Sequence, residues 1–168
     1  MRKQAVLLVC GILCLSSAVA ADVTLGGKSI PTDKFIVFLF IGNSNMAGRN
    51  GGGDKETHPN LWNYNFSNKE WIPAKSPIHN DGHTRGDGPA MVFGKKLVEK
   101  YPDFHFGIMQ NAGSSAWYCR YQKGCSQHSG GGSYYKELIT ENAIHLKDEV
   151  TWGGVLSNLG IIDRAKPD

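Results

Sequence analysis

A chain of 168 residues, 40% hydrophobic and 20% charged, has the length and composition of one globular domain with a core of its own. Its formal net charge of +3 falls to +1 without Arg2 and Lys3, so charge gives no reason to expect a nucleic acid or an anionic membrane as partner. After the first twenty residues no apolar run approaches the ~20 residues that a membrane helix needs, so we expect no membrane span there.

The amino terminus has the pattern of a secretory signal peptide. Arg2 and Lys3 form a basic start, residues 5–19 form an apolar segment, and Ala18-Val19-Ala20 supplies a small-residue cleavage site. We therefore expect a signal peptide over 1–20 and an exported protein, secreted or periplasmic, whose mature domain covers 21–168.

The cysteines predict a disulfide. Cys10 and Cys14 leave with the signal peptide, so Cys119 and Cys125 remain as an even pair in an oxidising compartment. A zinc site usually needs a second close pair of ligands, so we expect none here.

The first strand of the mature chain covers 35–41, seven consecutive apolar residues typical of a strand buried on both faces. It ends in Gly42-Asn43-Ser44-Asn45, and polar residues that follow such a strand lie at the carboxyl edge of the sheet, where open α/β folds bind ligands. Ser44 is therefore a candidate nucleophile. The local sequence leaves open the alternative that Gly-Asn-Ser-Asn is only the start of a helix, with Ser or Asn as its N-cap.

Three stretches around this strand show no regular period. Residues 22–34 read as a short polar lead-in, 47–60 are rich in turn residues, and 61–89 form a long irregular excursion. Aromatic rings in that excursion could stack on a sugar or pack the loop onto the domain, and we expect packing for at least half of them. The rings are those of Trp62, Tyr64, Phe66 and Trp71.

The rest of the chain alternates helices and strands. The patterns predict a helix over 89–101, a strand over 104–110, a small polar turn over 111–115, a helix over 134–149 and a strand over 152–158. This alternation indicates a layered α/β domain with a parallel sheet. A third strand followed by a short polar tail leaves the sheet with few covering helices, so we expect a truncated enzyme or a fragment.

Three stretches resemble one family. GNSNMAGR (42–49) resembles the first block, typically G-Q-S-N-M-A-G, of the SGNH (GDSL-like) hydrolases, which include sialate O-acetylesterases and acetylxylan esterases. GPAMVF (88–93) is similar to their Gly-Pro-x-x-x-Phe block, and NAGSSAWY (111–118) to their Gly-Gly-Thr/Ser-x-x-x-Trp turn. Together the matches run from Phe35 to about Asp163.

The resemblance implies a three-layer, flavodoxin-like parallel sheet and acyl transfer without a metal or organic cofactor. Ser44 would attack the carbonyl of an O-acetyl group on a carbohydrate, such as acetylxylan or a sialic-acid ester. The main-chain N–H groups of Ser44 and Gly88 would face the developing oxyanion, where one such donor is worth roughly 3 kcal/mol. The turn at Gly113 and Ser114 would form part of the site wall or the oxyanion region.

Two family features are missing. The third-strand block Gln-Gly-Glu-x-Asp corresponds here to Leu-Gly-Ile-Ile-Asp over 159–163, so Asn158 is the candidate substitute for the lost polar donor. No Asp-x-x-His occurs, so the base is predicted to lie beyond residue 168. These losses leave open an alternative function, that of a catalytically inactive, esterase-like carbohydrate-binding protein.

The six histidines supply few candidates for the missing base. His83, beside Asp81, is the histidine with some prospect of reaching Ser44. His79 and His83 have the spacing of helical metal ligands, but the residues between them indicate a turn, so no metal site is expected.

Overall fold

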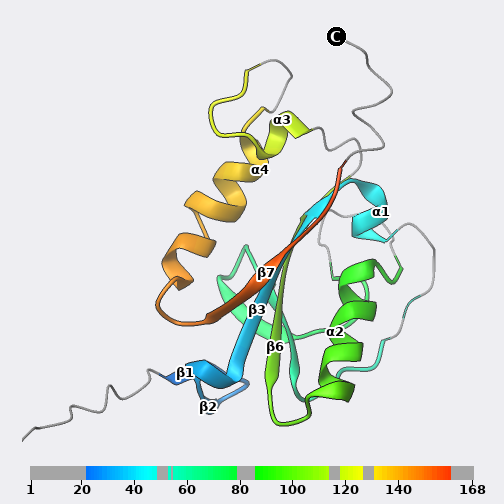
Figure 1. The fold of residues 1–168 in the computed structure, drawn as a ribbon, viewed down its shortest axis with the longest axis vertical. Helices are drawn as coiled ribbons and strands as arrows, with labels where there is room; N and C mark the ends of the chain where they lie inside the picture. Colours follow the sequence, from blue (N-terminus) through cyan, green and yellow to red (C-terminus); the bar gives the residue numbers. More distant parts are fainter. Residues whose placement is uncertain are drawn as a thin grey trace, which may run out of the picture.

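The computed structural model describes residues 22–48, 53, 55–78, 86–113, 118–126 and 131–159, and it centres on a mostly parallel sheet of five strands in the order β5-β4-β6-β3-β7 (Figure 1). These strands are β3 (Phe35–Gly42), β4 (Leu61–Asn65), β5 (Glu70–Pro73), β6 (His105–Ala112) and β7 (Thr151–Asn158). A separate antiparallel hairpin consists of β1 (Asp22–Leu25) and β2 (Lys28–Pro31).

The helical elements are short apart from α2. They are η1 (Thr32–Lys34), α1 (Ser44–Ala47), α2 (Pro89–Lys100), α3 (Tyr118–Tyr121), α4 (Ser133–Tyr135), η2 (Lys136–Thr140) and η3 (Ala143–Leu146). The predicted helix over 89–101 and the predicted strands over 35–41, 104–110 and 152–158 are thus confirmed, with ends shifted by one or two residues.

Strand β3 is buried on both faces, as its apolar run predicts. Phe35 and Val37 point into one core cluster, while Phe40, of opposite parity, belongs to the other. All three side chains are fully buried. The strand pairs in parallel with β6 on one side and with β7 on the other. It therefore lies between two parallel neighbours and contributes side chains to the core on each face of the sheet.

Different elements cover the two faces of the sheet, which gives the predicted three-layer arrangement (Figure 1). On one face α1 and α2 contribute Met46, Met91 and Val98 to the core. On the other, η2 and η3 contribute Leu138 and Leu146, and the β1–β2 hairpin packs there too.

The prediction that 61–89 is irregular is wrong for its first part, which forms β4 and β5. β4 joins the sheet in parallel with β6 and pairs antiparallel with β5. β4 shows no alternation of polar and apolar residues because both of its faces are covered. Its buried residues are Leu61, Trp62, Asn63 and Tyr64. The side-chain NH₂ group of Asn63 donates a hydrogen bond to the carbonyl of Ile78, and this bond reduces the cost of burying a polar residue in the core.

The expected lead-in over 22–34 is likewise an ordered hairpin. Val23 and Leu25 are buried while their neighbours are exposed, which is the alternation of a half-buried strand. Gly26 and Gly27 form the two-residue turn with φ of 56° and 79°, a backbone region that glycine adopts at little cost.

The expected helix over 134–149 is interrupted. After α4 the backbone widens into the π-helical turn η2, where the N–H of Glu141 donates to the carbonyl of Lys136, and then tightens into the 3-10 helix η3. The Asn142 side-chain amide donates to the carbonyl of Glu137 at 2.6 Å, so it takes an acceptor that a continuous α-helix would use itself.

The four aromatic residues of 61–73 pack mainly onto the domain, as expected for at least half of them. Trp62 and Tyr64 are buried in the core, and Phe66 and Trp71 are half-buried against it. The Trp71 ring meets the Phe35 ring edge-on at 4.8 Å and the Tyr64 ring at 5.0 Å.

Candidate functional site

Three strands end together at the carboxyl edge of the sheet. Gly42 at the end of β3 lies opposite Ala112 of β6 and Asn158 of β7. The N–H of Asn43 donates to the carbonyl of Asn158 at 3.1 Å, and the N–H of Gly113 donates to the carbonyl of Gly42 at 3.2 Å. Three predicted site residues, Ser44, Gly113 and Asn158, therefore come from segments that are hydrogen-bonded to one another.

Ser44 is the first residue of α1, directly beyond β3. The Asn43 side chain caps this helix by accepting the N–H of Asn45 at 2.9 Å. The turn therefore starts a helix, with Asn43 as the cap, and it also carries Ser44 at the edge of the sheet, where its role as nucleophile stays a prediction. Ser44 is 3% exposed, so its side chain is enclosed by its neighbours.

Gly42 fixes the path of the chain into this turn. A Cβ atom at this position would lie 2.6 Å from Cβ of Met46 and 2.8 Å from the carbonyl oxygen of Asn158. Both distances are too short for real atoms, so α1 and the end of β7 approach β3 this closely because residue 42 has no side chain.

Gly88 lies beside α1. It is the N-cap residue of α2, whose first turn donates the N–H of Met91 to the Gly88 carbonyl at 3.1 Å. A Cβ atom on Gly88 would lie 2.5 Å from the carbonyl oxygen of Met46, so the main chains of the two segments are in close contact. The described contacts of Gly88 are with Met46–Gly48 at the far end of α1.

Tyr121 is a residue of this edge that the sequence did not reveal. Its hydroxyl lies between the ends of β3 and β6, where it accepts the N–H of Gly42 at 3.0 Å and donates to the carbonyl of Asn111 at 2.6 Å. Burial raises the pKa of Tyr121 well above its ordinary value, so the hydroxyl stays protonated and remains a donor. Nothing in the local sequence distinguishes Tyr121 from the other tyrosines nearby.

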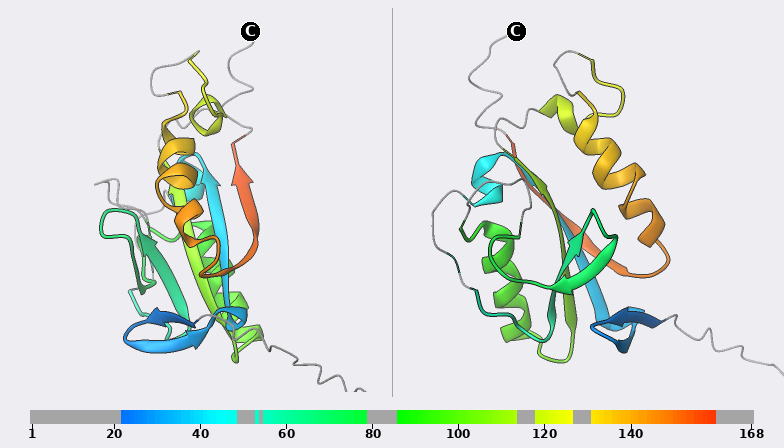
Figure 2. Two further views of the ribbon diagram at one scale, coloured as in Figure 1. Left: turned by 90° about the vertical axis from the view of Figure 1, so that its left-hand side faces the viewer. Right: turned by 180° about the vertical axis from the view of Figure 1, so that it is seen from behind.

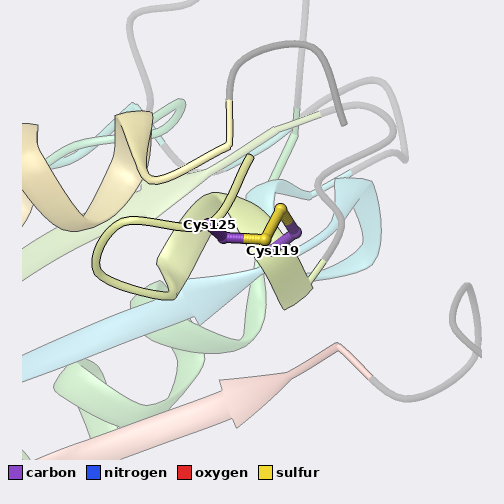
Figure 3. The surroundings of a disulfide bond; sticks show 2 residues. All are labelled: Cys119 and Cys125. Carbon is purple, nitrogen blue, oxygen red and sulfur yellow. A yellow bond between two sulfur atoms is a disulfide. The ribbon is translucent and has the colours of Figure 1, made fainter. Parts of the chain in front are cut away.

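A disulfide and a second tyrosine hold Tyr121 in place. Cys119 and Cys125 are bonded with their Cα atoms 5.5 Å apart, which confirms the predicted pair (Figure 3). The Tyr121 ring meets the Tyr134 ring edge-on, with the ring centroids 5.2 Å apart. The guanidinium of Arg120 lies over the Tyr134 ring, 5.2 Å from its centroid. The Tyr134 hydroxyl lies against Gly113, because a Cβ atom there would be 2.5 Å from it.

The described histidines lie away from Ser44. His58 and His105 are at the starts of β4 and β6, the opposite edge of the sheet, and His145 is in η3, which leads to the start of β7. Burial, with Lys28 nearby, lowers the pKa of His105, whose Nδ1 accepts the indole N–H of Trp62 at 3.3 Å. His79, His83 and Ser114 lie outside the described residues.

Within the described ranges, no group of three or more His, Cys, Asp or Glu side chains could hold a metal ion. No helix in this same part of the chain is long and apolar enough to cross a bilayer.

Comparison with known proteins gives a family and a fold. The family model described as carbohydrate esterase, sialic acid-specific acetylesterase, matches residues 34–167. A crystal structure of a protein from Arabidopsis thaliana has the same fold with a TM-score of 0.60 and 20% sequence identity. The similarity covers 76% of this chain and 58% of that one, so the chain spans less than two thirds of the length of that structure. No curated protein sequence matches significantly.

Proposed function

The chain belongs to the SGNH-type carbohydrate esterase family of sialic acid-specific acetylesterases, and on that premise we propose that it removes O-acetyl groups from carbohydrate through an acyl-enzyme at Ser44. The observation that carries the proposal is the position of Ser44 at the first residue of α1, on the carboxyl edge of a parallel sheet. Asn43 and Gly42 fix that turn, so the hydroxyl is held by the rigid end of a central strand.

In the proposed reaction the Ser44 oxygen attacks the acetyl carbonyl and gives up its proton to a base. The sugar hydroxyl then leaves with a proton, and water hydrolyses the acetyl-serine to acetate. The negative charge on the carbonyl oxygen needs N–H donors within hydrogen-bond reach. The proposed donors are the N–H groups of Ser44 and Gly88 and the side-chain amide of Asn158. The segments of Ser44 and Asn158 are hydrogen-bonded at the edge of the sheet, and Gly88 packs against the far end of α1.

The base that accepts the Ser44 proton is proposed to come from outside the described residues. The histidines at 58, 105 and 145 do not lie beside Ser44, so we assign the role to a group beyond residue 168, and His83 is the alternative within this sequence. A serine without a base is a weak nucleophile, so the identity of this group decides the rate.

The test is hydrolysis by the protein expressed from its whole reading frame. We expect hydrolysis of p-nitrophenyl acetate and acetylated carbohydrate, and a loss of roughly 1000-fold or more in kcat/KM for Ser44→Ala. Ser133→Ala is the matched control, because Ser133 is an exposed serine on another element. Acid quenching during turnover, followed by mass spectrometry, should place the acetyl group on the peptide that contains Ser44. Equal rates for wild type and Ser44→Ala would refute the proposal.

We also propose that the protein is exported after removal of residues 1–20. The signal-peptide pattern and the Cys119–Cys125 disulfide support this, because structural disulfides persist in oxidising compartments. Amino-terminal sequencing of the protein from the extracellular or periplasmic fraction should begin at Ala21 or Asp22. An uncleaved protein confined to the cytosol would contradict it.

A further inference from the structure

Segments that are far apart in sequence meet where α1 approaches α2. The view from behind in Figure 2 shows the two helices one above the other on the same side of the sheet. A Cβ atom on Gly48 would lie 2.6 Å from the carbonyl oxygen of Gly86 and 2.7 Å from the nitrogen of Gly88. Real Cβ atoms do not approach so closely, so the stretch 86–88 lies directly against the end of α1.

A hydrogen bond between two side chains ties this stretch to another segment. The hydroxyl of Ser76 donates to Oδ1 of Asp87, the residue directly before Gly88. We call this pair the clasp. Ser76 is 2% exposed, whereas Asp87 lies at the surface, so the serine is the enclosed partner. A hydrogen bond to a carboxylate is stronger than one between two neutral groups, so the clasp is well suited to hold a short stretch of chain.

Ser76 is itself anchored to the sheet. The N–H of Ala74 donates to the carbonyl of Leu61, the first residue of β4, at 3.0 Å. The carbonyl of Ile78 accepts the side-chain amide of Asn63, also on β4, at 3.3 Å. Ser76 therefore lies between two attachments to an interior strand, and its hydroxyl has a defined position relative to the sheet.

Two further residues enclose the clasp. Nζ of Lys55 donates to the carbonyl of Ser76 at 3.0 Å. A Cβ atom on Gly53 would lie 2.8 Å from Cβ of Ser76 and 3.2 Å from the nitrogen of Asp87. The main chain at residue 53 thus packs against both partners, and a side chain there would push them apart.

The clasp acts on a residue that the proposed reaction uses. The N–H of Gly88 is a proposed oxyanion donor, and such a donor is effective when it already points at the place where charge develops. Asp87 has a glycine on each side, so its carboxylate is the only side-chain group of 86–88 that can fix the direction of this main chain.

We propose that Ser76 is a positioning residue for the esterase reaction, which holds the Gly88 N–H in place through its hydrogen bond to Asp87. The inference rests on the proposed function at Ser44. It adds a residue from outside the three stretches that resemble the family. Because Ser76 is enclosed, it acts through Asp87 and does not touch the substrate.

The experiment breaks the clasp from each side. Ser76→Ala removes the donor, Asp87→Ala removes the acceptor, and the double variant removes both. Asp87 is exposed, so Asp87→Ala should fold even where a change at the buried serine does not. Asp87→Asn keeps an oxygen that can accept from Ser76. Asp103→Ala is the matched control, since Asp103 is also an exposed aspartate but follows the other end of α2.

We expect Ser76→Ala and Asp87→Ala each to lower kcat for p-nitrophenyl acetate about tenfold with little change in KM, because an oxyanion donor acts on the transition state. The double variant should lose no more than either single variant, since all three lack the same hydrogen bond. Asp87→Asn should keep roughly a third or more of the wild-type kcat. Asp103→Ala should leave both constants unchanged.

Hydrogen–deuterium exchange, measured by mass spectrometry, tests the clasp without a substrate. The amides of 86–92 should exchange faster in Ser76→Ala and Asp87→Ala than in wild type or Asp103→Ala, because the stretch loses its attachment. Wild-type exchange in both clasp variants would overturn the proposal.

The outcomes separate this proposal from the esterase function. If hydrolysis depends on Ser44 while Ser76→Ala and Asp87→Ala keep the wild-type kcat or change KM alone, the positioning role is overturned and the esterase function stands. Additive losses in the double variant also overturn the role, because the two residues would then act separately. Hydrolysis that does not depend on Ser44 overturns the esterase function and the positioning role with it, whatever the exchange rates.

Discussion

At the scale of single residues, local sequence predicts a site best where the candidate reactive residue and the residues that shape its backbone are neighbours in sequence. Ser44 and its cap Asn43 are such a case. The Asn43 cap and the end of β3 are both encoded within the eleven residues from 35 to 45. Tyr121 acts over a distance of 79 residues in sequence, since its hydroxyl binds Gly42. No spacing rule connects two such positions, so the tyrosine that closes the edge of the sheet is visible only in the folded chain.

Removing this hydroxyl tests its role as a positioning residue. Tyr121→Phe leaves the Gly42 N–H and the Asn111 carbonyl without this partner, which should cost about 1–3 kcal/mol and lower Tm by several degrees. We expect kcat for p-nitrophenyl acetate to fall about tenfold, equivalent to about 1.4 kcal/mol, with little change in KM, because the Ser44 turn loses its support.

Tyr101→Phe is the control for that variant, since Tyr101 is 43% exposed at the end of α2. A Tyr121→Phe protein with reduced Tm but unchanged kcat would assign the hydroxyl to stability alone.

At the scale of elements, the structure departs from the prediction where polar residues are satisfied inside the fold. β4 contains a buried asparagine, and an asparagine amide also interrupts the helical run after η2. Both depend on a specific hydrogen bond that periodicity does not detect. The β1–β2 hairpin is a different case, because two alternating segments joined by Gly26-Gly27 are a recognisable hairpin pattern that the prediction passed over.

The disulfide is the element-level feature that can be removed cleanly. It closes a loop between residues six apart in sequence, and replacing both Cys119 and Cys125 with serine should cost about 2–3 kcal/mol by the loop-entropy argument. Since α3 carries Tyr121, we also expect reduced esterase activity. Thermal unfolding of wild type with and without reductant measures the same difference independently. If reduction changes neither Tm nor activity, the bond does not support this edge.

At the scale of the whole molecule, the sequence patterns predict a layered α/β domain and three of its parallel strands, while the three-layer form is implied by the family resemblance. The strand order β5-β4-β6-β3-β7 does not follow from those patterns. Most strands that are neighbours in the sheet are not consecutive in sequence, and the patterns do not say which strands pair. Pairing of that kind is decided by which faces bury together. In this protein β4, β6 and β3 each contribute residues to both cores, and these three strands are the interior strands of the sheet.

The stability of the whole molecule should depend on pH through His105. Burial and Lys28 lower its pKa in the folded state, so the folded protein binds this proton less readily than the unfolded chain. The stability that neutral His105 contributes is therefore complete above about pH 6.5, the unfolded value, and declines as the pH falls from there toward the folded pKa.

We expect chemical unfolding between pH 8 and pH 5 to show this decline, and His105→Asn to reduce it while keeping an acceptor for Trp62. His145→Asn, at an exposed position, should retain the contribution of His105. An unchanged slope in His105→Asn would contradict the assignment.

Gly42 finally limits how this protein can evolve. Any side chain at that position would overlap Met46 and the main chain of Asn158, so a change of this one codon displaces the start of α1 together with Ser44. Clones recovered from a library randomised at position 42 should therefore keep glycine, whichever acetyl ester is used for selection. New specificity would have to arise in the surrounding loops, while the turn itself passes unchanged from one variant to the next.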